Sequence, residues 1–141
     1  MKRLILMFVA CVMFGCTNNG GQPNMEKALN KFVEELQADV SDFDAILFIP
    51  LEGCGSCIEH GVGFFKEYKD IPSILFVFCT YKPYSYDYLK NVDSPNVIVD
   101  KSNMAIKHHI LSTVPVVYKK ENGVFKCLGT AVGKFDFSVL F

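Results

Sequence analysis

The chain has 141 residues, half of them hydrophobic, and this length and composition fit one domain with a buried core. Its formal net charge is −1 and no stretch gathers basic residues, which argues against a nucleic-acid partner. No internal repeat or long low-complexity segment is visible.

The first residues have the pattern of an export signal. Lys2 and Arg3 precede an apolar run over residues 4–14, which is too short to span a bilayer, since a spanning helix needs roughly 20 apolar residues. The run ends at Cys16 in a sequence that resembles the cleavage box of bacterial lipoproteins, with Met13 where the box usually has Leu. The resemblance implies that residues 1–15 are a signal peptide and that Cys16 carries a lipid. An ordinary secretory signal and an uncleaved anchor are the alternatives.

After such cleavage, residues 16–24 read as a flexible tether, because Thr17 to Asn24 is rich in Asn and Gly. Residues 25–141 then form the domain, outside the cytoplasm (periplasmic in a Gram-negative cell) and attached to the membrane by the lipid. Disulfides persist in that compartment.

The domain alternates helical and strand patterns, which predicts an α/β fold with a mixed, mostly parallel sheet covered by helices on both faces. Asn122-Gly123 lies between two apolar runs and predicts a tight turn that joins them as a hairpin. Ser102 could cap the last helix, and two glycines, Gly61 and Gly63, mark close packing or a bend in the second. The predicted helices cover residues 25–40, 57–68, 84–91 and 102–110; the predicted strands cover residues 44–49, 74–79, 96–99, 115–118 and 124–128.

Cys54-Gly55-Ser56-Cys57 follows the first strand and opens the second helix. A cysteine at a helix start lies among unpaired backbone N–H groups, and the positive end of the helix dipole favours its thiolate. Cys57 lies one turn further on and can attack a mixed disulfide that Cys54 has formed. The spacing therefore predicts thiol–disulfide exchange, with Cys54 as nucleophile and Cys57 as resolving thiol.

The other cysteines are assigned by the same reasoning. Of six in the chain, Cys11 leaves with the signal peptide and Cys16 is acylated, so four remain. Four cysteines allow three full pairings, and Cys54 with Cys57 is the expected pair. Cys79 and Cys127 read as small buried hydrophobic residues, although Cys79 ends a strand at the edge where it could approach the pair.

Residues 40–130 resemble the thioredoxin-like superfamily, especially extracytoplasmic bacterial thiol–disulfide oxidoreductases. Three features carry the resemblance, in the family's order: the strand leading to Cys54–Cys57, the run Val97-Ile98-Val99-Asp100 before a short helix, and Ser112-Thr113-Val114-Pro115 before a strand. The resemblance implies a cis-proline at Pro115 and a substrate contact at Val114. It also implies protein thiols or disulfides as substrates, no cofactor, and a membrane electron donor if the protein is a reductase. A plain strand-initiating proline is the alternative for Pro115.

The chain also departs from the thioredoxin pattern. It has no Trp, and Gly53 precedes the first cysteine. Phe48 stands where thioredoxins bury an acid that deprotonates the resolving thiol; Glu52 or Glu59 could substitute, although a solvated surface acid is the expected role of each. The direction of the redox reaction is therefore open.

Metal binding and simple protein binding are the competing functions. Zinc would need two further ligands, and His108 and His109 are consecutive, so their side chains diverge on a helix. Copper held by the two cysteines and one of these histidines is the stronger metal alternative, and a redox-silent binding module of the same fold is the other. His60 could assist Cys54, although a packed histidine is the expected reading. The tyrosines near Pro83 could cover the sheet or form a recognition surface (Tyr81, Tyr84, Tyr86 and Tyr88).

Overall fold

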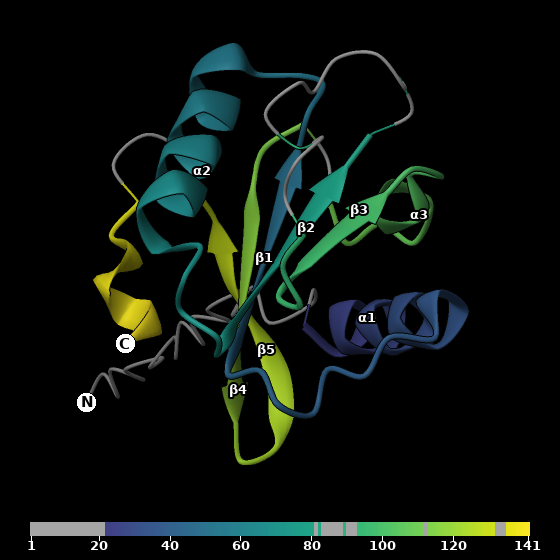
Figure 1. Ribbon diagram of the computed structural model, residues 1–141. Coiled ribbons are helices and arrows are strands. Elements are labelled where there is room, and N and C mark those ends of the chain that lie inside the picture. The colour runs from purple at the N-terminus through teal and green to yellow at the C-terminus, as the bar shows by residue number, and fades with distance from the viewer. Residues whose placement is uncertain (1–21, 81, 83–88, 90–92, 112, 132–134) are drawn as a thin grey trace, which may run out of the picture.

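The computed structural model describes residues 22–80, 82, 89, 93–111, 113–131 and 135–141. Within these ranges, no helix combines the length and the apolar character that crossing a membrane requires. Figure 1 shows the elements in chain order: α1 (Gln22–Leu36), β1 (Ala45–Pro50), α2 (Gly55–Tyr68), β2 (Ile74–Cys79), β3 (Val97–Asp100), α3 (Met104–Lys107), β4 (Val116–Glu121), β5 (Val124–Thr130) and the 3₁₀-helix η1 (Phe137–Leu140).

The five described strands form one sheet in the order β3-β2-β1-β4-β5. Strand β2 pairs parallel with both β1 and β3, whereas β4 pairs antiparallel with both β1 and β5. The predicted α/β class and mixed sheet are therefore confirmed, although parallel and antiparallel pairings are equal in number. Every residue of β1 and β2 is buried, as expected for parallel strands covered on both faces.

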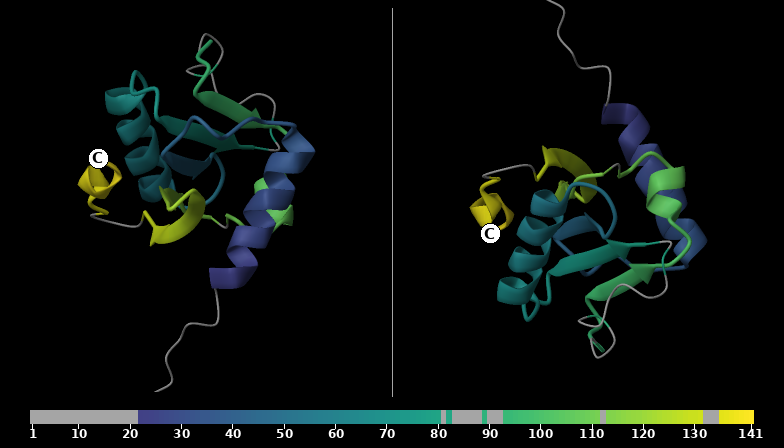
Figure 2. Two further views of the ribbon diagram at one scale, coloured as in Figure 1. Left: turned by 90° about the horizontal axis from the view of Figure 1, so that it is seen from below. Right: turned by 90° about the horizontal axis from the view of Figure 1, so that it is seen from above.

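Helices cover both faces of the sheet, as predicted. Successive side chains of a strand point to opposite faces, so β1 contributes to two cores. Leu47 and Ile49 pack with residues of α2 and η1, while Ile46 and Phe48 pack with residues of α1 and α3. Figure 2 shows the sheet between these two layers, with α2 on one side and α1 and α3 on the other.

The first helix is shifted from its predicted range. It begins at Gln22, so residues 22–24, predicted as part of the tether, are helical; Pro23 fits because the first turn of a helix needs no proline N–H. It ends at Leu36, earlier than predicted. Gln37 takes a left-handed conformation with φ 52°, and the N–H groups of Gln37 and Ala38 donate to the carbonyls of Glu34 and Val33. These two bonds form a Schellman motif, which closes the helix.

The helix near residue 104 is much shorter than predicted, and Ser102 is not its cap. Asn103 occupies the N-cap position without a side-chain bond. The carboxylate of Asp100 instead accepts bonds from the N–H groups of Ser102, at 3.1 Å, and Ala105, at 2.9 Å. Because Asp100 ends β3, the strand itself provides the acceptor and the helix can start only after it. His109, with φ 59°, stops the helix one turn later.

The remaining predictions divide three ways. The hairpin is confirmed, with Asn122 and Gly123 at positive φ between β4 and β5, as a tight two-residue turn requires. Close packing explains Gly61, where a Cβ would lie 3.1 Å from Cγ of Pro115, whereas Gly63 faces open space. The predicted helix over residues 84–91 falls outside the described part of the chain except for Leu89.

Candidate functional site

The two motif cysteines lie at the carboxyl edge of the parallel strands, where β1 leads into α2. Cys54 is the N-cap residue of α2 and has an extended backbone (φ −70°, ψ 105°). The carbonyl of Cys54 accepts the first helical bond from Ile58, at 2.9 Å. The loop between β1 and α2 is tied to β2, because the N–H of Leu51 donates to the carbonyl of Cys79. This arrangement matches the placement that the sequence predicted for the motif.

The two thiols differ in exposure and in acidity. Cys54 is half-buried, whereas Cys57 is only 5% exposed; both are free thiols. A hydrogen bond from the Cys57 side chain, and then one from Ser56, lowers the pKa of Cys54. The same interaction with Cys54, followed by burial, raises the pKa of Cys57. At a pH between these two values, the accessible sulfur is a thiolate and the inner sulfur keeps its proton.

Ser56 is the residue whose role the sequence did not reveal. Its hydroxyl lies 3.5 Å from the sulfur of Cys54. The backbone N–H groups of Cys57 and Ser56 also lower the pKa of Cys54, although neither makes a helix-capping hydrogen bond to it. They act as aligned dipoles at the helix start. A serine between two cysteines is a weak signal by itself, and only the helical turn brings its oxygen over the first sulfur.

The segment before β4 lies against the cysteine loop, as the resemblance implied. The N–H of Cys54 donates to the carbonyl of Thr113 at 3.3 Å. Pro115 is buried beside Gly61 of α2, while Val114 is half-buried. The structure thus brings residues 113–115 next to the motif, although nothing in it tests a substrate contact at Val114.

The predicted cis bond at Pro115 is wrong, because the described peptide bonds include no cis bond and Val114 and Pro115 are both described. An X–Pro bond favours the trans form by about 0.5–1 kcal/mol. Here the trans bond already packs the proline ring onto α2, and the Pro115 carbonyl accepts a 2.7 Å bond from the N–H of Ala131.

Neither Glu52 nor Glu59 supplies the buried acid that the resemblance to thioredoxins implies. Phe48 is fully buried in the core beneath α1 and α3. Glu52 accepts a 2.9 Å bond from the hydroxyl of Thr80, and Glu59 is exposed on α2. Neither acid contributes to the pKa shift of Cys54 or Cys57. Glu52 instead acts on Cys79, where its charge helps to raise the pKa of the thiol.

Burial raises the pKa of both remaining thiols, Cys79 and Cys127. Cys79 is completely buried on the face that packs against α1 and α3; burial first, then the charges of Asp100 and Glu52, raises the pKa of its thiol well above the usual range. Burial likewise raises the pKa of Cys127, which lies half-buried on β5 opposite Tyr118. The interpretation of both as small hydrophobic residues agrees with these surroundings.

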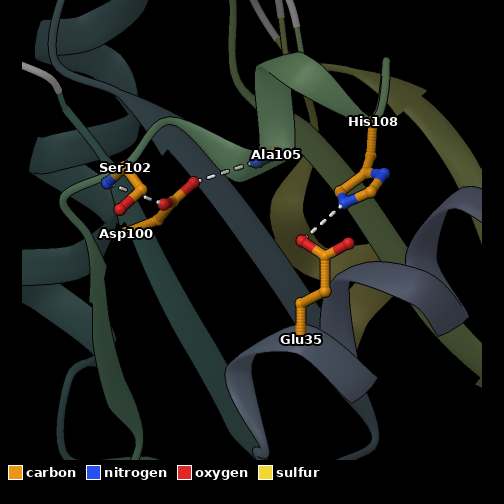
Figure 3. A network of polar contacts seen from close by, with 5 residues as sticks. All are labelled: Glu35, Asp100, Ser102, Ala105 and His108. Carbon is orange, nitrogen blue, oxygen red and sulfur yellow. Dashed lines mark hydrogen bonds and ion pairs between the residues drawn. The ribbon is translucent and has the colours of Figure 1, made fainter.

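His60 and His108 each contact a side chain other than the motif cysteines. The ring of His60 packs on Phe137, with ring centroids 5.1 Å apart. Figure 3 shows the ring of His108 against the carboxylate of Glu35, a contact of 3.0 Å between Nε2 and the nearer oxygen that links the end of α3 to α1 beside the Asp100 cap. No group of three His, Cys, Asp or Glu residues within the described ranges could hold a metal ion.

Several predicted features lie outside the described residues: the apolar run over residues 4–14 with Cys11, the lipidation residue Cys16, Ser112 and the tyrosines of residues 81–88. Comparisons with models of protein families, with curated proteins and with solved structures found no match to this chain.

Proposed function

We propose that this protein is a thiol–disulfide oxidoreductase of thioredoxin-like fold that acts on disulfides or dithiols of extracytoplasmic proteins. The observation that carries the proposal is the asymmetry of the Cys54–Cys57 pair at the start of α2. An accessible thiol with a lowered pKa and a buried partner with a raised pKa are what a two-step exchange needs.

The exchange proceeds in two displacements. The Cys54 thiolate attacks one sulfur of a substrate disulfide, so that a mixed disulfide forms and the other substrate sulfur leaves as a thiolate. Cys57 then loses its proton to solvent and attacks the Cys54 sulfur. This step forms the Cys54–Cys57 disulfide and releases the second substrate thiolate. Two electrons pass from the protein to the substrate, and a dithiol donor must return them; run in reverse, the same steps oxidise a substrate dithiol.

The shape of the site supports a polypeptide substrate. The residues around Cys54 are small and exposed, namely Gly53, Gly55, Ser56 and Thr113. A bulky protein disulfide can therefore approach the sulfur without meeting a large side chain from these positions. In the proposed complex, the backbone of Val114 runs beside an extended substrate segment, with Pro115 behind it.

The reduction potential of the Cys54–Cys57 pair tests the proposal. The full chain is equilibrated in detergent with glutathione or dithiothreitol, and the pair is quantified by differential alkylation and peptide mass spectrometry. A value near −270 mV, roughly, indicates a reductase and one near about −120 mV an oxidant. Cys54→Ser should abolish exchange with a disulfide peptide, whereas Cys127→Ala should not. If no reversible disulfide forms at any ratio, the proposed reaction is wrong and copper or protein binding replaces it.

The proposed location has its own test. We propose that Cys16 is acylated after removal of residues 1–15, which would attach the domain to the membrane. Metabolic labelling with a fatty acid should mark the wild-type chain and not Cys16→Ser, and the variant should leave the membrane fraction. A label retained in Cys16→Ser would contradict the proposal; Cys11→Ser is the matched control and should keep the label.

A further inference from the structure

We infer that Gly53 and Thr113 form a backbone latch that positions Cys54 for its disulfide with Cys57. The latch consists of one hydrogen bond and one close contact. The N–H of Cys54 donates to the Thr113 carbonyl at 3.3 Å. A Cβ at Gly53 would lie 2.8 Å from both the Cβ and the carbonyl oxygen of Thr113. This inference rests on the proposed redox function and adds two positioning residues to it.

Gly53 is required at its position for two independent reasons. Its φ is +129°, a conformation that residues with a side chain rarely adopt. The approach to Thr113 also leaves no room for a methyl group, because backbone as well as side-chain atoms of Thr113 would have to move. The latch thus depends on the absence of a side chain at the residue before the nucleophile.

Cys54 needs such a device because it lies outside the helix. Cys57 is held by α2 and is buried, so its position is determined by the helix. Cys54 is the N-cap residue, and the helix holds its main chain only at the carbonyl, which accepts the bond from the Ile58 N–H. A disulfide requires the two α-carbons to lie about 4.4–6.8 Å apart with the β-carbons directed at each other. Holding the amide of Cys54 against Thr113 restricts the loop to one arrangement and raises the effective concentration of the pair.

A second glycine holds the same segment further along. Gly61 lies against Pro115, where a Cβ would be 3.1 Å from Cγ of the proline. Residues 113–115 are therefore attached to the motif helix at both ends of the segment. The position of Thr113, and with it the acceptor for Cys54, is determined by α2 itself.

The chain offers two glycines as matched controls. Gly129 has a φ of +137°, close to that of Gly53, but a Cβ there would meet nothing within 4 Å. Gly63 has neither a positive φ nor a contact. Gly129→Ala therefore imposes backbone strain without a steric clash at the site, and Gly63→Ala imposes neither strain nor a clash.

The test compares the equilibrium between dithiol and disulfide at Cys54–Cys57 in the full chain, in detergent, against glutathione. Gly53→Ala should shift the equilibrium constant toward the dithiol by at least about tenfold, because misplacing a reacting group has effects of this order or larger. Gly129→Ala and Gly63→Ala should stay within a factor of about three of the wild type. If Gly53→Ala equals Gly129→Ala while the wild type cycles, the latch is wrong and the redox function stands. If the wild type forms no disulfide, the proposed function fails and the latch fails with it.

Hydrogen exchange keeps the inference testable if Gly53→Ala does not fold. In the reduced wild-type protein, the amide of Cys54 should be protected at least about tenfold more than the amide of Gly55, which starts the helix and has no helical partner. Equal protection of the two amides would overturn the latch.

Discussion

Cys54 and Cys79 lie at the same edge of the sheet, yet the pKa values of their thiols are shifted in opposite directions. Cys54 stands at the N-terminus of α2, half-exposed, and its pKa is lowered by the side chains of Cys57 and Ser56. Cys79 ends β2, is completely buried, and has a pKa raised first by burial and then by two carboxylates. The parallel strands place both cysteines at one edge of the sheet, but the helix start and the access of water decide which sulfur reacts.

The polar groups at this edge explain the difference further. Two acids act on Cys79: Glu52, which accepts a bond from Thr80, and Asp100, which accepts bonds from the backbone at the start of α3. Negative charge disfavours a second negative charge on the Cys79 sulfur. Near Cys54 the neighbours are hydrogen-bond donors, which favour a thiolate.

The largest expected effect is in alkylation. When the reduced, folded protein is treated with iodoacetamide at neutral pH, Cys54 should react at least about 100-fold faster than Cys79, because both access and thiolate fraction favour it. Peptide mass spectrometry over a time course gives the two rates. Similar rates in the folded protein, with equal rates in denaturant as the control, would remove the contrast between the two thiols.

The next effect is on stability. Phe48→Asp places a carboxylate at the position where the proposed likeness to thioredoxins implies one, but on a face of the sheet whose core contains the rings of Phe32 and Tyr118. An unpaired buried charge should lower the free energy of unfolding by about 3–5 kcal/mol. Urea unfolding measures this loss, with Phe48→Leu as the milder apolar control. A variant as stable as Phe48→Leu would mean that this core admits water.

A smaller effect is expected at Cys79. Cys79→Ser puts a hydroxyl into the same apolar core and should cost about 1–3 kcal/mol of unfolding free energy. Thiol exchange by Cys54 should not change. Cys79→Ala separates the loss of packing from the burial of a polar group, and a loss of exchange in both variants would give Cys79 a redox role that its surroundings do not indicate.

The smallest effect concerns Ser56. Removing its hydroxyl in Ser56→Ala should raise the pKa of Cys54, because a donor to the thiolate is lost. The thiolate disappears as pH falls through that pKa, so the variant should alkylate a few-fold more slowly at pH values below it and equally fast at high pH. The pH profile of Cys54 alkylation measures the shift, and Ser102→Ala is the control. An unchanged midpoint of the pH profile would mean that Ser56 does not lower the pKa of Cys54, which would leave the Cys57 thiol and the helix start as its causes.

Sequence by itself predicted the parts that depend on local pattern. Continuous apolar runs predicted β1 and β2, because strands covered on both faces need no polar alternation. Asn122-Gly123 predicted the hairpin through its tolerance of positive φ, and the motif after β1 predicted cysteines at a helix start. The likeness to thioredoxins and the lipid at Cys16 stay predictions.

Tertiary structure alone decided the features that depend on contacts between distant segments. The packing of Pro115 against Gly61 and the hydrogen bond from the Cys54 N–H to the Thr113 carbonyl both join segments that lie far apart in the sequence. In the sequence, Gly53 was notable only as a departure from the thioredoxin pattern. In the structure, the close approach of Thr113 requires a glycine at this position. Local pattern reports what one segment prefers, and it includes the neighbours Ser56 and Cys57 that lower the pKa of Cys54. The latch between Gly53 and Thr113, in contrast, joins segments that only the fold brings together.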